Sequence, residues 1–325
     1  MSKKMYNEQL KWEFINSIPT ESTKVKAKTV FYSSFKVEQE YNKDVIFFTK
    51  EELIHLFEQM SWTSQNVFSG NKNIIARYIT FCSQKKIISN DAYQNIVSLK
   101  SAEVNNTASC LNKYYKNFNE VVTALNKIFN SETDYNLLRM KCICGLLWYG
   151  VPVSDVTTLT SANINQDSNT IQCASIKKKV SVPRYIIDWC NILSNTLTYT
   201  SANGKEYVLK GGDQIIKTKC IEGYEEKENA DIRCLQNLFR TFVKTTGQKL
   251  SEMTEEQRKE IHYKRLIIDN LQCNGRFEKA YKIEKTNSSF KNSTEYGDAV
   301  YNNAVRSTAD REYGVYLSWK RAYNL

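Results

Sequence analysis

The first hundred residues carry apolar side chains at helical spacing. Leu10, Phe14 and Ile18 recur at i, i+4 and i+8, which predicts an amphipathic helix that Pro19 ends. A second helix is predicted over residues 24–41, although its β-branched and aromatic residues favour helix less strongly. The chain is therefore predicted to begin with an all-helical region.

Two further helices are predicted in the same region. Thr49 and Glu52 form a capping-box sequence, in which each side chain accepts a hydrogen bond from the other residue's backbone amide. Apolar residues recur at helical spacing from Leu53 onward and again over residues 73–84, which a Lys-Lys pair follows.

The periodicity is lost over residues 101–116, where Asn, Ser and Thr become frequent. We predict that this segment is a linker. It would divide the chain into a helical domain over residues 1–107 and a second domain over residues 108–325.

The second domain mixes helices with short strands. Asn119 is expected to cap a helix, and residues 134–149 form the most apolar helix of the chain, whose lack of a polar face indicates burial on most sides. β-branched residues over 170–182, around three lysines, predict a small sheet with a basic turn. Helices return over 184–197 and 231–246. The predicted fold class is mainly α with a small antiparallel β-sheet.

Composition narrows the class of partner. The formal net charge is +10, which favours a polyanion, nucleic acid before an anionic membrane, over a merely soluble basic protein. Nine scattered cysteines without a CxxC pair read as reduced thiols, and two histidines make a zinc site improbable. The start of the chain is not signal-like, and no apolar run is long enough to span a bilayer. We expect a cytoplasmic protein without metal or cofactor.

Four sequence elements stand in a fixed order from residue 145 onward. The first is the run Gly145-Leu-Leu-Trp-Tyr-Gly150-Val-Pro-Val-Ser154-Asp-Val-Thr-Thr-Leu159. The others are the lysines Lys177, Lys178 and Lys179, the motif His262-Tyr-Lys-Arg265, and a segment with Asn274-Gly275, Lys285-Thr-Asn287-Ser-Ser289 and Tyr296, nine residues after Asn287.

In order and spacing these elements resemble the tyrosine recombinases, or phage integrases. The first run is similar to the family's box LLxxTGLRxSELxxL, His262 and Arg265 match its HxxR motif, and Tyr296 stands at the spacing of its nucleophile. The resemblance covers about half of the chain. It implies a two-domain DNA clamp, with a SAM-like core-binding domain over residues 1–107 and a catalytic-type domain over 108–325.

The resemblance also implies a chemistry that this chain lacks in part. In the family a tyrosine attacks a DNA phosphate while two arginines and a histidine hold its oxygens and a lysine protonates the leaving group. Here Pro152 stands at the first arginine and Asn287 at the second His/Trp position. Losing one preorganised donor at such a site costs about 3–4 kcal/mol. We therefore expect no active catalytic residue, only the relic positions Pro152, Lys177, His262, Arg265, Asn287 and Tyr296.

Cationic groups that remain can still bind phosphates in the ground state. The predicted DNA-binding residues are Lys72, Arg77, Lys85, Lys86, Lys177, Lys178, Lys179, His262, Arg265 and Tyr296, with base reading by the helix around 72–86. The expected partners are double-stranded DNA operator sites and phage- or host-encoded regulatory proteins, with no membrane, at the nucleoid of a bacterial host. Likeness of the whole chain to phage repressors of lysogeny implies a prophage transcriptional repressor.

Three alternatives stay open. The chain could be an active integrase in which Arg139 or Arg184 replaces the missing arginine. It could also use the recombinase scaffold to bind protein partners, in which case the positive net charge would have no role in binding. Within the resemblance itself, Gln236-Asn-Leu-Phe-Arg240 is a second candidate for HxxR, but it has Phe where arginine should stand and no tyrosine at the right distance. We prefer His262.

Overall fold

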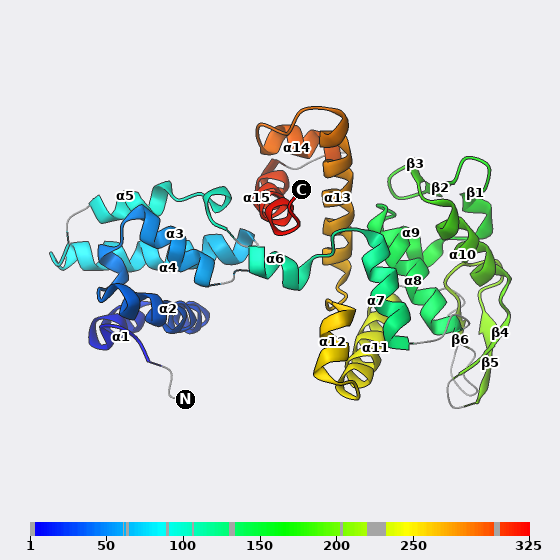
Figure 1. Cartoon of the computed structure of the whole chain (residues 1–325), viewed down its shortest axis with the longest axis horizontal. Coiled ribbons are helices and arrows are strands. Elements are labelled where there is room, and N and C mark those ends of the chain that lie inside the picture. Colours follow the sequence, from blue (N-terminus) through cyan, green and yellow to red (C-terminus); the bar gives the residue numbers. More distant parts are fainter. Residues whose placement is uncertain are drawn as a thin grey trace. The chain divides into compact units, whose positions relative to one another are not determined.

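The computed structural model describes residues 4–60, 62, 65–88, 91–105, 107–129, 134–201, 204–219, 232–301 and 306–325. The chain forms two compact units: unit 1 joins residues 1–113 with 288–325, and unit 2 comprises residues 114–287. Both are shown in Figure 1. The predicted class, mainly α with small antiparallel sheets, is confirmed.

Unit 1 is helical throughout its described part. Its elements are α1 (Glu8–Ser17), α2 (Glu21–Tyr41), η1 (Val45–Phe47), α3 (Lys50–Gln59), α4 (Gln65–Gln84), α5 (Asp91–Ser98), η2 (Ser101–Glu103), α6 (Thr107–Lys113), α14 (Ser293–Val300) and α15 (Arg306–Ala322). The predicted helices over 24–41 and 73–84 are confirmed in α2 and α4. The capping box at Thr49 is also confirmed, because its hydroxyl accepts from the Glu52 amide and Glu52 accepts from the Thr49 amide.

An aromatic core joins α1, α2 and α4. The rings of Phe14, Phe31 and Tyr78 contact one another at centroid distances of 5.0–5.9 Å. Beside them Lys11 and Glu38 form a fully buried ion pair, and Glu38 also accepts from the amide of Val45. Because both charges are paired and hydrogen-bonded, the pair fixes α1 against α2 and does not belong to the solvent-facing surface.

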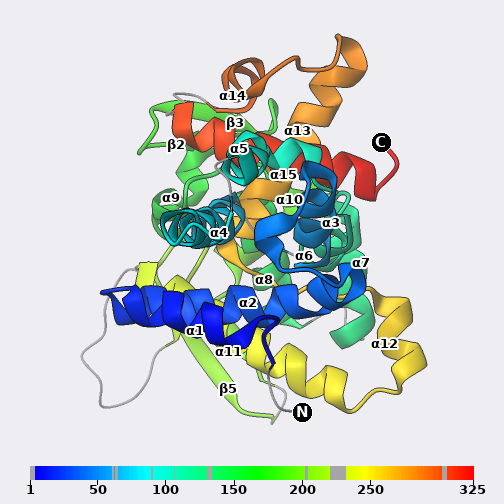
Figure 2. The ribbon, with the colours of Figure 1, turned by 90° about the vertical axis from the view of Figure 1, so that its left-hand side faces the viewer.

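The boundary between the two units falls after Lys113, inside the predicted linker over 101–116, but most of the segment is helical. The segment holds η2 and α6, and Val104, Cys110 and Tyr114 are buried. Its apolar residues lack local periodicity because their partner is distant in sequence: α15 packs on η2, α6 and α4, and α14 packs on α15 (Figure 2). The C-terminal residues 288–325, which we had assigned to the second domain, therefore lie in unit 1.

Unit 2 combines helices with two small sheets. Its helices are α7 (Phe118–Phe129), α8 (Tyr135–Trp148), α9 (Val153–Thr158), η3 (Ser161–Asn163), α10 (Arg184–Asn195), α11 (Ile232–Ser251), α12 (Glu255–Ile261) and α13 (Ile268–Thr286). Its strands are β1 (Ile164–Asn165), β2 (Thr170–Cys173), β3 (Lys178–Ser181), β4 (Thr198–Thr200), β5 (Glu206–Lys210) and β6 (Thr218–Lys219).

Helix α8 is the centre of the unit 2 core. It is buried along nearly its whole length, as its lack of a polar face predicted, and α7, α10 and α13 pack on it. At the crossing with α13, Gly275 lies so close to the Trp148 carbonyl that a Cβ atom would collide with it. The Asn274-Gly275 pair therefore has a packing role, since glycine alone allows this approach.

The first sheet has the order β1-β2-β3 and is antiparallel, with Ile171 opposite Val180 and Cys173 opposite Lys178. This is the small sheet that the sequence predicts. The second sheet, β4-β5-β6, was not predicted, although Thr198-Tyr-Thr and Glu206-Tyr-Val-Leu alternate as strands do.

Candidate nucleic-acid interface

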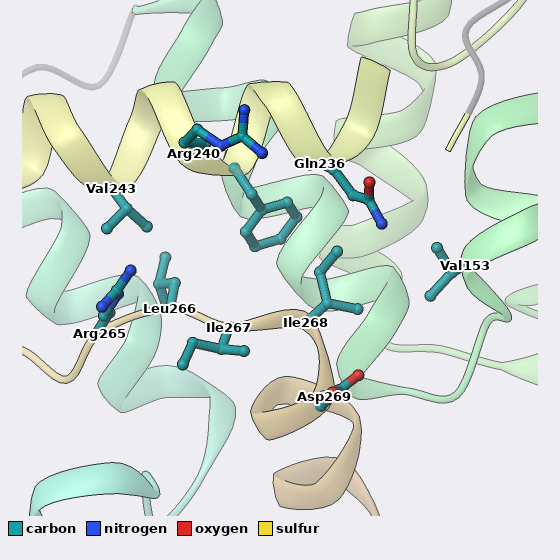
Figure 3. Close-up of a pocket in the computed structure, with 10 residues that line it drawn as sticks. Val153, Gln236, Arg240, Val243, Arg265, Leu266, Ile267, Ile268 and Asp269 are labelled. Atoms are coloured by element: carbon teal, nitrogen blue, oxygen red, sulfur yellow. The ribbon is translucent and has the colours of Figure 1, made fainter. Parts of the chain in front are cut away.

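An open cleft of about 460 Å³ lies in unit 2 between α11, the start of α9 and the irregular segment that leads into α13. Figure 3 shows its side chains. The lining residues are Val153, Gln236, Phe239, Arg240, Val243, Arg265, Leu266, Ile267, Ile268 and Asp269. Two arginines thus stand at a cleft whose floor is largely apolar.

Helix periodicity explains the α11 side of this cleft. Gln236, Phe239, Arg240 and Val243 recur at i, i+3, i+4 and i+7 and so lie on one face of the helix, where Phe239 is buried. Arg240 is exposed, and among the residues that the structure describes it donates to Asn237 on its own helix, at 3.3 Å. Its guanidinium is therefore available to a ligand in the cleft.

Arg265 supplies the second cation. It is exposed, and no ion-pair partner stands beside it among the residues that the structure describes. His262 ends α12 with a left-handed backbone, at φ 53°, and residues 263–267 are irregular. His262 and Arg265 therefore do not share a helix, and only Arg265 lines the cleft.

Lys264 faces the opposite way from its neighbour Arg265. It is 9% exposed, its Nζ donates to the Tyr114 carbonyl at 2.5 Å, and it lies 4.8 Å from the Tyr115 ring centroid. Burial lowers the pKa of Lys264 to about 8, with Glu120 opposing the shift. Of the two basic residues in the motif, one is thus buried in the core and one is presented to solvent.

The relic of the first arginine position stands at the rim. Pro152 is the N-cap residue of α9 and Val153 lines the cleft, so neither offers a charge there. Nearby, the buried Asp155 accepts from the Ser175 amide at 3.1 Å and also from its hydroxyl. Asp155 therefore ties α9 to the turn that carries the lysines.

All three lysines of that turn are exposed. Lys177 adopts a left-handed backbone at φ 51°, and Lys178 and Lys179 pair with Cys173 and Gln172 on β2. The pKa of Lys279 on α13 is lowered, first by desolvation and then by the charge of Lys178. The turn and α13 therefore contribute to one basic surface within unit 2.

The other two relic positions differ in their surroundings. Asn287 is exposed and is the C-cap residue of α13, at the end of unit 2. Tyr296 belongs to α14 in unit 1, is fully buried, and donates its hydroxyl to Glu312 Oε1 at 2.6 Å. The rings of Phe290, Tyr313 and Tyr316 surround it.

The four predicted base-reading residues on α4 and just after it are not equivalent. Lys72 donates to the carbonyls of Val97 and Leu99, at 2.8 and 2.7 Å, and burial lowers its pKa. Lys85 forms an ion pair with Glu13. Only Arg77 and Lys86 are exposed without such a partner among the described residues.

Sequence reasoning missed a second face of unit 1. The exposed residues of α2 between Glu21 and Glu38 include no carboxylate, and they form a row of small hydroxyls flanked by lysines. They are Ser22, Val25, Lys26, Thr29, Ser33 and Lys36. The hydroxyls of Thr29 and Ser33 bond back to the helix. The signal was present in the sequence, as sixteen residues without an acidic side chain between Glu21 and Glu38, but helical phasing was needed to find it.

The two arginines suggested as substitutes in an active integrase are engaged elsewhere. Arg139 is 7% exposed, stacks over Tyr135 and donates to Asn136. Arg184 pairs with Asp188 and donates to the Gln166 carbonyl. Neither lines the cleft. The second candidate for HxxR, over residues 236–240, does line the cleft through Gln236 and Arg240. Sequence spacing alone favours His262 over it.

Within the described residues no cluster of potential metal ligands occurs, and no helix there has the length and apolar character needed to cross a bilayer. Fold and site together define a mainly helical two-unit protein with cationic surfaces on both units.

Comparison with known proteins adds a family likeness for unit 1. Residues 5–84, about a quarter of the chain, match the family described as MrpR, N-terminal core-binding domain. No curated protein matches the chain. Among solved structures, the Tn1549 transposon integrase (residues 82–397, in complex with circular intermediate DNA) is similar at 11% identity, with a TM-score of 0.33 over 94% of this chain and 98% of that one.

Proposed function

We propose that this protein is a sequence-specific double-stranded DNA-binding protein on a tyrosine-recombinase scaffold that does not cleave DNA. Its role is that of a transcriptional repressor that occupies operator sites and keeps a prophage lysogenic at the nucleoid of its bacterial host. The core-binding match over residues 5–84 supports DNA as the partner. The net charge of +10 supports a polyanion independently.

One observation carries the absence of cleavage. The Tyr296 side chain is fully buried among aromatic rings, and its hydroxyl already donates to a carboxylate. A nucleophile must reach a phosphate at about van der Waals contact before it can attack. The neutral side chains of Pro152 and of its neighbour Val153, which lines the cleft, support the same conclusion, because neither offers a cationic side-chain donor to a developing phosphorane charge.

DNA binding itself rests on surfaces of both units. On unit 1 the α2 face offers hydroxyls and lysines, which suit base edges and phosphates. On unit 2 the Lys177 turn and Arg265 are exposed cations that attract phosphates. Regulatory proteins of phage or host origin would act by competing for one of these surfaces.

Two measurements test the proposal. Genome-wide occupancy of the native protein, followed by gel shifts on the recovered fragments, should reveal a small set of duplex sites bound in preference to random DNA. Suicide substrates built on those sites should give no covalent protein–DNA adduct. Absence of duplex binding at low salt would overturn the DNA-binding role, whereas an adduct would overturn the claim that the protein does not cleave.

A further inference from the structure

The segment that presents Arg265 has no regular backbone hydrogen bonding. It lies between the end of α12 at Ile261 and the start of α13 at Ile268. Lys264 and Leu266 in this segment are buried, so their backbone groups need partners inside the protein. Two tyrosine hydroxyls contribute such partners.

Tyr115 satisfies both backbone groups of Lys264 with one hydroxyl. Its Oη accepts from the Lys264 amide at 2.8 Å and donates to the Lys264 carbonyl at 3.0 Å. Tyr263 Oη accepts from the Leu266 amide at 3.5 Å, a longer and weaker contact. Tyr115 therefore holds the amide and the carbonyl of Lys264, the residue just before Arg265.

Tyr115 is itself fixed at its backbone. Its amide donates to Asn274 Oδ1 at 3.2 Å, and its carbonyl accepts from Asn274 Nδ2 at 2.9 Å. Asn274 is 1% exposed on α13 and Tyr115 is 3% exposed. Lys264 adds the bond from its Nζ to the Tyr114 carbonyl. The cluster is buried and cannot touch a ligand.

We propose that Tyr115 is a positioning residue for Arg265. Its hydroxyl holds the Lys264 backbone so that the next side chain projects into the cleft beside α11. This inference rests on the proposed function, in which Arg265 contacts a DNA phosphate. In this proposal Tyr115, which is buried and does not contact DNA, controls how strongly Arg265 binds the phosphate.

Tyr115→Phe removes only the hydroxyl and keeps the ring in the core. We expect it to weaken specific DNA binding about three- to thirtyfold, the range for one or two hydrogen bonds. In an Arg265→Ala background the same substitution should change affinity less than twofold, because there is no arginine left to position. Tyr149→Phe is the control: it removes a partly buried tyrosine hydroxyl of unit 2, bonded to Tyr185 at 3.0 Å, and should leave DNA binding unchanged.

Equal losses from Tyr115→Phe with and without Arg265 would overturn the proposal, as would no loss in either background. A second measurement needs no DNA. Hydrogen exchange at the Lys264 amide should accelerate in Tyr115→Phe and stay at the parental rate in Tyr149→Phe; unchanged exchange in Tyr115→Phe would also overturn it. If the parent binds no duplex, the proposed function fails, while the exchange result still decides whether Tyr115 holds the segment.

Discussion

The hydroxyl of Tyr296 donates to Glu312 across 2.6 Å, and both residues belong to the C-terminal part of unit 1. The two side chains join α14 to α15 inside an aromatic cluster. A buried tyrosine in this environment contributes to stability through its hydrogen bond.

Tyr296→Phe should therefore destabilise the protein without changing its affinity for DNA. Loss of a hydrogen bond to a charged acceptor costs about 1–3 kcal/mol of unfolding free energy. Urea unfolding checks the stability, and gel shifts well below the melting temperature check the binding. A folded variant that fails to repress a reporter would show instead that the hydroxyl acts in function.

The cations of unit 2 should determine the salt dependence of DNA binding. Each phosphate contact contributes about 0.9 to the slope of log affinity against log salt. Arg265→Ala should lower that slope by about one, on specific and random duplexes alike, and combined Lys177→Ala, Lys178→Ala and Lys179→Ala should lower it by two or more.

The control for these variants is Lys259→Ala. Lys259 is an exposed lysine of α12 that already pairs with Glu255, at 2.8 Å. Its loss should leave the slope within error of the parent. If all variants share the parental slope and affinity, the phosphates must be bound elsewhere on the protein.

Much of the fold could be predicted from the sequence because its helix caps and strands depend on residues close together in the chain. The Thr49 capping box involves two residues three positions apart, and it forms as expected. Apolar spacing likewise located α2, α8 and α11. The small sheet around the lysines followed from its β-branched residues.

Long-range packing could not be predicted in this way. Val104 and Cys110 are buried where α15, far along the chain, packs on η2 and α6, so their local pattern is typical of a linker. The candidate site shows the same limit: counting charges placed Lys72 and Lys85 among DNA contacts. In the structure the first donates to two carbonyls and the second pairs with a carboxylate, contacts that connect segments distant in sequence.

We therefore expect the lysines of unit 1 to divide into a structural group and a DNA-facing group. Lys72→Met should lower the unfolding free energy by about 1–3 kcal/mol, since two carbonyls at the end of α5 lose their donor, and should leave the salt slope unchanged. Lys26→Ala and Lys36→Ala on α2 should do the reverse, each lowering the slope by about one with little effect on stability.

Footprinting separates base recognition from phosphate binding on the α2 face. Ser33→Ala on the α2 row should alter preference among duplex sequences more than total affinity for random DNA, because hydroxyls can contact base edges. If Lys72→Met instead reproduces the slope of Lys26→Ala, α4 contacts the phosphates and the assignment to α2 is incorrect.

Lys264 should make stability depend on pH above neutrality. Its folded pKa is about 8, against an ordinary value of 10.5, because burial disfavours the charged form. Below about pH 8 both states hold the proton and the cost of burying the charge is constant. Between about pH 8 and 10.5 the unfolded chain binds more protons than the folded one, so unfolding free energy rises with pH.

This rise should disappear in Lys264→Met. The difference in unfolding free energy between parent and variant should therefore move in favour of the parent from about pH 7 to pH 10, measured by urea titration. Burial also raises the pKa of Tyr263, to about 12, and that of Tyr115, which lowers stability above about pH 10. Both tyrosines remain in the variant, so their effect largely cancels in the difference.

The control is Lys259→Met, at an exposed ion pair, for which the difference in unfolding free energy from the parent should not change with pH. A flat or falling difference for Lys264→Met would mean that Lys264 keeps its proton through this range, and that its bond to the Tyr114 carbonyl outweighs its burial.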